Sequence, residues 1–208
     1  MPRIRKVVVE ATDELARRDR GIRRMLAVHG YPELRRKSDG RTHFAALARS
    51  ICYQQLAGRA AAAIHGRFVA LYDGDPTPEA VLATPVDTMR ACGLSASKAA
   101  SIRDLALAGD DGRVAFDRLG RLPDDEVVRE LVQVRGIGEW TAQMFLMFQL
   151  GRLDVWPTLD YGVRSGFTKL YALGEMPSPK QLAPLGDPFA PYRSVVAWYC
   201  WRAADTEL

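Results

Sequence analysis

The stretch that decides the fold is residues 131–161, which read LVQVRGIGEWTAQMFLMFQLGRLDVWPTLDY. A turn bracketed by Gly136 and Gly138 separates two segments with helical patterning, and a single acid, Asp160, follows in an apolar loop. Glycines let another backbone approach closely, and the free N–H groups of a helix that begins near residue 139 favour a phosphate. The stretch therefore predicts a grip on a nucleic-acid backbone beside one isolated carboxylate.

The segment after the turn strengthens this interpretation. A Gly-x-Gly turn between helices is by itself typical of an ordinary connection with a glycine cap. Residues 140–148, however, are apolar on nearly all sides, which is typical of a deeply buried helix. A turn attached to a buried helix is held rigidly, so we expect DNA contacts from Arg135, Gly136, Gly138 and Thr141.

The composition is that of a globular protein with a substantial core. The chain has 208 residues, of which 48% are hydrophobic and 26% are charged, and its net charge is +4 with a pI near 9.1. Arginine dominates the basic residues, which suits phosphate binding but is also favoured by GC-rich genomes. The cluster between Arg17 and Arg24 is either a phosphate-facing patch or, as we favour, a solvated helix face.

The sequence contains no apolar run long enough to span a membrane and no signal-peptide pattern at its N-terminus, which predicts a cytoplasmic protein. We also expect a monomer. The three cysteines, Cys52, Cys92 and Cys200, are odd in number and far apart. This pattern does not favour a disulfide framework, and three cysteines cannot supply the four ligands of an iron–sulfur cluster, so we expect buried core thiols.

Helical periodicity dominates the chain, and almost no strand pattern is present. The sequence therefore predicts an all-α protein with short connections. The expected helices cover residues 11–29, 44–71 in one or two pieces, a segment capped by Thr77 and another by Thr84-Pro85, then 95–108, 123–134, 139–150, 159–171 capped by Thr158, and 192–204. A Pro/Gly-rich segment, 174–191, is expected to be a connection.

The block from residue 123 to Asp160 resembles the helix-hairpin-helix motif of the DNA glycosylase superfamily that carries a Gly/Pro-rich loop and an aspartate. The loop 153–160 matches the family's loop, and segments 50–56 and 191–201 resemble its DNA-probing segment and its C-terminal helix. The resemblance implies a two-lobed helical fold with an active-site cleft between the lobes. The expected single catalytic unit, 1–208, has approximate lobes formed by 1–44 with 151–208, and by 45–150, with the hairpin 135–138 at the cleft.

The resemblance also implies a chemistry. Asp160 takes the place of the catalytic acid, which stabilises the oxocarbenium-like sugar that forms when an N-glycosidic bond breaks. A helix dipole behind it would favour its ionised form. Trp140 stands where family members that also nick the strand carry a Schiff-base lysine, which predicts a monofunctional enzyme. A tryptophan there resembles the 3-methyladenine DNA glycosylase II type, whose cationic purines suit Trp140, Tyr161 and Trp201, whereas Trp198 is expected in the core.

Further roles follow from the resemblance. The base must leave the duplex, and Gln54, Gln55 and Leu56 lie in the segment expected to contact DNA and fill the gap. Gln55 and Leu56 are the better candidates, because Gln54 also suits a structural role at a helix end. Lys98 is either near DNA or simply exposed, and Arg193 either binds phosphate or pairs internally; the sequence leaves both open.

The predicted partner is double-stranded DNA that contains damaged bases, with no membrane and no cofactor or metal. A monovalent cation held by main-chain carbonyls at the hairpin stays open. Many family members have a second polar residue beside the acid, where this chain has Leu159. Two alternatives remain: a glycosylase for deaminated or oxidised bases, and a non-catalytic helix-hairpin-helix module. A pure binding module needs neither Asp160 nor the tryptophans. The lesion range and the opposite-base preference are not encoded in any motif.

Overall fold

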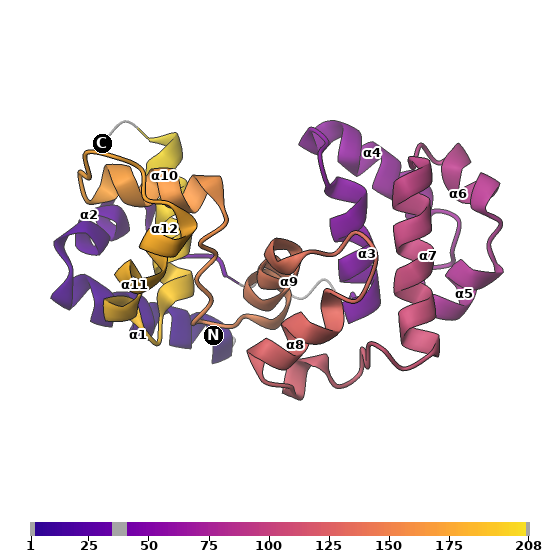
Figure 1. Ribbon diagram of the computed structural model, residues 1–208, viewed down its shortest axis with the longest axis horizontal. Coiled ribbons are helices and arrows are strands. Elements are labelled where there is room, and N and C mark those ends of the chain that lie inside the picture. Colours follow the sequence, from indigo (N-terminus) through magenta and orange to yellow (C-terminus); the bar gives the residue numbers. More distant parts are fainter. Residues whose placement is uncertain (1–2, 35–40, 207–208) are drawn as a thin grey trace. The chain divides into compact units, whose positions relative to one another are not determined.

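The computed structural model describes residues 3–34 and 41–206, and every regular element within these ranges is helical (Figure 1). The prediction of an all-α protein is confirmed. The chain divides into two compact units, one formed by Met1–Lys37 with Leu146–Leu208 and the other by Ser38–Phe145.

The first unit is discontinuous in sequence, because two N-terminal helices pack with the C-terminal third of the chain. Its elements are α1 (Arg3–Arg18), α2 (Arg20–His29), the π-helical turn η2 (Leu146–Leu150), α10 (Tyr161–Leu170), α11 (Pro179–Leu185), the 3-10 turn η3 (Asp187–Phe189) and α12 (Arg193–Asp205). Helix α12 is the centre of this unit, since it contacts α1, α2, α10 and η3. Gly166 of α10 faces the backbone of Cys200 so closely that no side chain fits between the two helices.

The second unit is built around α7 (Ala96–Asp110), the magenta helix in Figure 1, whose contacts with α3, α5 and α6 bury Ile102 and Leu105. The remaining elements are α3 (His43–Tyr53), α4 (Gly58–Val69), α5 (Pro78–Ala83), α6 (Val86–Ala91), the 3-10 turn η1 (Leu119–Arg121), α8 (Asp124–Leu131) and α9 (Glu139–Phe145). Helices α8 and α9 pack on one another, so the unit contains a helix-hairpin-helix arrangement.

The predicted helix boundaries are wrong at several points. The helix expected over 11–29 is two helices, because Asp19 adopts an extended conformation and caps α2 by accepting a hydrogen bond from Ile22 N at 2.7 Å. Thr77 caps α5 as predicted, whereas Thr84 ends α5 and does not begin α6. The Pro/Gly-rich segment 174–191 contains α11, which begins with a capping box at Ser178.

Other expectations are confirmed. All three cysteines are free and buried, and burial raises the pKa of the Cys52 thiol to about 12. Arg17, Arg18, Arg20, Arg23 and Arg24 are all exposed, which suits a solvated helix face and a phosphate-facing patch alike, so the preference for a solvated face stays a prediction. None of the helices described is long and apolar enough to cross a bilayer.

Candidate active site and hairpin

Asp160 is the N-cap of α10, and its Oδ1 accepts a hydrogen bond from Val163 N at 2.8 Å. The prediction that Thr158 caps this helix, with Asp160 inside its first turn, is therefore wrong. The reason is a tight turn, in which Thr158 N donates to Trp156 O and Asp160 N donates to Pro157 O, so that the helix starts two residues later. An N-cap carboxylate still lies at the positive end of the helix dipole.

Trp201 of α12 fixes the same carboxylate from the side. Its indole Nε1 donates to Asp160 Oδ1 at 2.9 Å, and its ring packs beside Phe148 with centroids 5.8 Å apart. A side chain on Gly162 would collide with this indole, since a Cβ there would lie 2.8 Å from Trp201 Cδ1. The absence of a side chain at position 162 thus lets Trp201 reach the acid, and two N–H donors set the orientation of the carboxylate.

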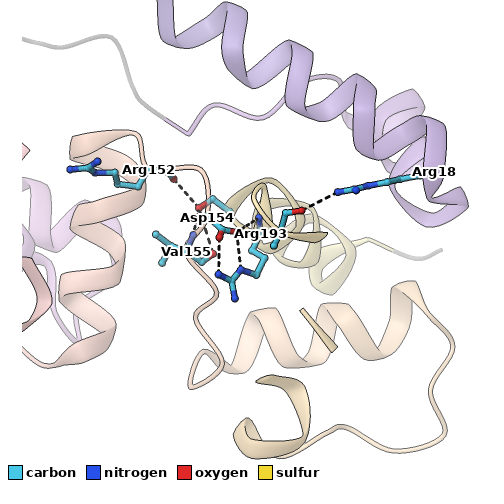
Figure 2. A network of polar contacts seen from close by, with 7 residues as sticks. Arg18, Arg152, Asp154, Val155 and Arg193 are labelled. Carbon is cyan, nitrogen blue, oxygen red and sulfur yellow. Dashed lines mark hydrogen bonds and ion pairs between the residues drawn. The ribbon is translucent and has the colours of Figure 1, made fainter. Parts of the chain in front are cut away.

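The loop that leads to Asp160 is also tied to α12 at its beginning, as Figure 2 shows. Arg193 donates to both carboxylate oxygens of Asp154, at 2.8 and 2.7 Å. Ser194 Oγ donates to Arg152 O and accepts from Val155 N. The bidentate Arg193 ion pair holds the pKa of Asp154 below its ordinary value. Arg193, whose role was open, therefore pairs internally.

The aromatic residues expected at the substrate differ in exposure. Tyr161 follows the acid directly and is 69% exposed, Trp201 is partly buried against Asp160, and Trp140 is 44% exposed in the first turn of α9. Trp198 is buried, as predicted for a core residue. Trp201 thus contacts Asp160 directly, whereas Tyr161 is its exposed neighbour in the sequence, and all three lie in the first unit.

The hairpin lies in the second unit, between α8 and α9. Gly136 has a left-handed backbone (φ +78°), and a Cβ at this position would lie 2.5 Å from Ser101 Oγ of α7. Arg135 N donates to Asp104 Oδ2 at 2.7 Å. Gly136 is therefore needed by the fold itself, because its conformation and its close packing both exclude a side chain.

Gly138 has different surroundings, since a Cβ at this position would meet no atom within 4 Å. The fold does not require a glycine there, so the open space suits close approach of a ligand backbone. Thr141, three residues further, is buried and its Oγ1 accepts from Gln54 Nε2 at 3.4 Å. Its place is thus beneath the hairpin surface, whereas Arg135, Gly136 and Gly138 are exposed.

Gly138→Leu is expected to weaken binding to unrelated duplex sequences equally, by about tenfold, without lowering the melting temperature. The added side chain fills space that a phosphate would occupy, and a lost phosphate contact reduces the salt dependence by about one unit of slope. Fluorescence anisotropy on two unrelated duplexes at several salt concentrations measures both effects. The matched control is Gly174→Leu, which also faces open space but in the first unit. A loss confined to one sequence contradicts the backbone grip.

The end of α3 holds the residues expected to fill the gap in the duplex. Gln54 caps α3, and its Nε2 donates to Gly136 O at 2.9 Å, which agrees with the structural role considered for it. Gln55 is exposed and has a left-handed backbone (φ +55°), and Leu56 is 39% exposed. A non-glycine residue in this conformation is uncommon and is typical of functional sites.

Two residues that support the site were not identified from the sequence. Asp104 and Asp154 anchor the hairpin and the loop, but each lies more than thirty positions from its partner (|i−j| 31 and 39), so no local pattern marks them. Lys98 is neither free nor simply exposed, because its Nζ donates to Cys52 O and Gln54 O. The cation at the hairpin stays a prediction; Val134 O and Gly136 O already accept hydrogen bonds from Ile137 N and Gln54 Nε2.

Comparison with known proteins identifies the family. The model of the HhH-GPD superfamily of base excision DNA repair proteins matches residues 48–189. The chain belongs to this superfamily. The HhH-GPD match spans the end of α3, the hairpin, the Asp160 loop and α10, so it includes the elements described above.

Individual HhH-GPD relatives resemble the chain over nearly its whole length. DNA-3-methyladenine glycosylase 1 of Schizosaccharomyces pombe is 32% identical over 200 residues, which cover 95% of this chain and 88% of the relative. The structure of the S. pombe 3-methyladenine DNA glycosylase in complex with abasic DNA has a TM-score of 0.81 at 31% identity, covering 95% and 97% of the two chains. A DNA-3-methyladenine glycosidase from Bacillus halodurans has a TM-score of 0.82 at 35% identity, covering 92% and 88%.

Proposed function

We propose that this protein is a monofunctional DNA glycosylase that removes alkylated purines of the 3-methyladenine and 7-methylguanine type and leaves an abasic site. The observation that carries the proposal is the Asp160 carboxylate, held by Trp201 Nε1 and Val163 N in a member of the HhH-GPD superfamily. The relatives named 3-methyladenine glycosylases support the substrate class. The two units, 1–37 with 146–208 and 38–145, are proposed to act as one catalytic unit.

In the proposed reaction Asp160 acts on the sugar of the extruded nucleotide. As the N-glycosidic bond lengthens, positive charge builds on the anomeric carbon, and a fixed carboxylate stabilises that charge. The same carboxylate orients the attacking water and takes its proton. Because Trp201 and Val163 hold Oδ1, the carboxylate needs little reorganisation during the reaction.

The aromatic residues explain a preference for cationic bases. A 3- or 7-methylated purine carries positive charge, and an aromatic face attracts such a ring by about 0.5–2 kcal/mol. Trp201 contacts the acid through its indole, and Tyr161 follows the acid in the sequence with an exposed side chain. The charged base is already a good leaving group, so no strong general acid is needed. The contact expected for Trp140 stays a prediction.

The positions of the lysines support the proposed absence of lyase activity. Position 140 carries a tryptophan, and Lys98, the one lysine described in the second unit, binds two main-chain carbonyls through Nζ at 2.7 Å each. Lys6, Lys169 and Lys180 lie in the first unit, and Lys37 lies outside the described residues. Without a lysine at the start of α9, no Schiff base with the sugar is expected.

The test is base release from duplex DNA with 7-methylguanine at one position. Wild-type protein is expected to release the methylated base and to leave the strand uncut until alkali is added. Borohydride present during the reaction is expected to trap no protein–DNA adduct. A trapped adduct contradicts the monofunctional assignment, and release of deaminated or oxidised bases without methylated ones contradicts the substrate class.

A further inference from the structure

One side of α7 carries three polar residues at three-residue spacing, Lys98, Ser101 and Asp104, and this spacing places them on neighbouring turns. Lys98 contacts the end of α3, whereas Ser101 and Asp104 both contact the hairpin. The proposed catalytic chemistry uses none of them, yet all three face the two elements expected to meet DNA.

Lys98 closes the C-terminal end of α3. Its Nζ donates to Cys52 O and to Gln54 O, both at 2.7 Å. The last carbonyls of a helix have no partner within the helix, and a cation there also complements the helix dipole. Half-burial of Lys98 lowers the pKa of its ammonium group through desolvation, so the two carbonyl contacts replace the water that it loses.

Ser101 and Asp104 hold the hairpin from the same helix. Ser101 packs against Gly136, and Asp104 accepts the Arg135 N–H at 2.7 Å. Arg113 donates to the other oxygen of Asp104 at 3.1 Å. Desolvation opposes ionisation of Asp104, but the Arg135 N–H and Arg113 outweigh it and hold its pKa below the ordinary value. The anchor of the hairpin is therefore a charged one.

A third contact connects the two segments directly. The Gln54 side chain donates to Gly136 O at 2.9 Å, immediately before the left-handed residue Gln55 and the exposed Leu56. The end of α3, the hairpin and α7 thus form a closed set of hydrogen bonds within one compact unit. Hydrogen bonds from the side chains of α7 and of Gln54 hold the loop 54–56 at a fixed spacing from the hairpin.

We propose that Lys98 is a positioning residue for base extrusion: by holding Cys52 O and Gln54 O, it sets the loop 54–56 in register with the phosphate-binding hairpin. This rests on the proposed function, because it assumes that the loop enters the duplex. Lys98 itself contacts neither the base nor the phosphate. Without the two hydrogen bonds from Lys98, the loop 54–56 still forms. Its position relative to the hairpin changes, so it no longer enters the duplex at the nucleotide whose backbone the hairpin binds.

The test compares two substrates, one with 7-methylguanine opposite cytosine and one with 7-methylguanine in a one-nucleotide bulge, where little extrusion is needed. Lys98→Met keeps the length of the side chain and removes its donors. We expect single-turnover base release from the paired substrate to fall on the order of 10- to 100-fold, and from the bulged substrate by less than about threefold. Lys98→Arg, which keeps donors in a different geometry, is expected to lie between Lys98→Met and wild type.

The ratio of the two rates is the decisive readout, since partial unfolding lowers both rates by the same factor and leaves the ratio unchanged. Lys169→Met is the matched control: Lys169 also donates to a main-chain carbonyl, Ala204 O, but in the first unit, so its ratio should equal that of wild type. Equal losses on both substrates, or an unchanged rate on the paired one, overturn the positioning role. If wild-type protein releases no methylated base from either substrate, the proposed function itself fails.

Discussion

Asp160→Asn is expected to lower the release of methylated purines on the order of a thousandfold or more, while DNA affinity changes by less than about threefold. Asparagine keeps an oxygen that accepts from Trp201 Nε1 and Val163 N, so the head of α10 retains its geometry. The variant loses only the negative charge and the ability to take a proton from water. The loss therefore appears in the chemical step and not in binding.

Single-turnover release from a 7-methylguanine duplex and anisotropy with the same duplex separate the two effects. The matched control is Asp205→Asn, which makes the same change at an exposed position of α12 and should react at the wild-type rate. Normal turnover by Asp160→Asn would remove Asp160 from the mechanism. A loss of affinity equal to the loss of rate would show that the carboxylate serves binding.

Gly166→Ala is expected to cause the largest loss of stability among glycine-to-alanine changes at the described positions. A Cβ there would overlap the carbonyl of Cys200 and lie 2.8 Å from its Cα, and these are backbone atoms that no rotamer change can move. Helix α10 must shift away from α12, at a cost of about 3 kcal/mol or more. The melting temperature is therefore expected to fall by about 6 °C or more. Base release should fall as well, since Asp160 is the N-cap of α10 and Trp201 lies in α12.

Thermal unfolding followed by circular dichroism measures the effect. Gly66→Ala is the matched control, because Gly66 is also inside a helix but faces open space, and alanine there should be neutral or stabilise by about 0.5–1 kcal/mol. An unchanged melting temperature for Gly166→Ala would mean that the two helices do not approach as closely as described.

Much of the fold was predictable because it depends on local patterns. Helical periodicity gave the all-α class, and the cap at Thr77 marked the start of α5. The start of α10 was not predictable in the same way, since Thr158 and Asp160 are both good N-caps. The turn at Pro157, visible only in the folded chain, decides between them.

The tertiary partners of the site residues were less predictable than the site residues themselves. The type and place of Asp160 came from its motif, but its hydrogen bond to Trp201 joins positions 41 residues apart. Arg193 and Lys98 show the same limit. The sequence offers two roles for Arg193, and its distant partner Asp154 decides between them. For Lys98 the sequence suggests a place near DNA or an exposed side chain, and neither alternative includes the carbonyls at the end of α3 that it binds. Sequence patterns report chemistry and local conformation, whereas tertiary partners decide how each group is used.

The loop that carries Asp160 is tied to α12 at both ends, through Arg193 and Ser194 at its start and Trp201 at its finish. In the proposed enzyme the carboxylate is therefore ready before any nucleotide arrives, and it favours a damaged base no more than a normal one. Selectivity must then arise from other features: how readily a base pair opens, how weak the bond to the sugar already is, and how strongly Tyr161 and Trp201 attract a cationic base. Among cationic bases, the proposed enzyme is therefore expected to release fastest those whose bond to the sugar is weakest.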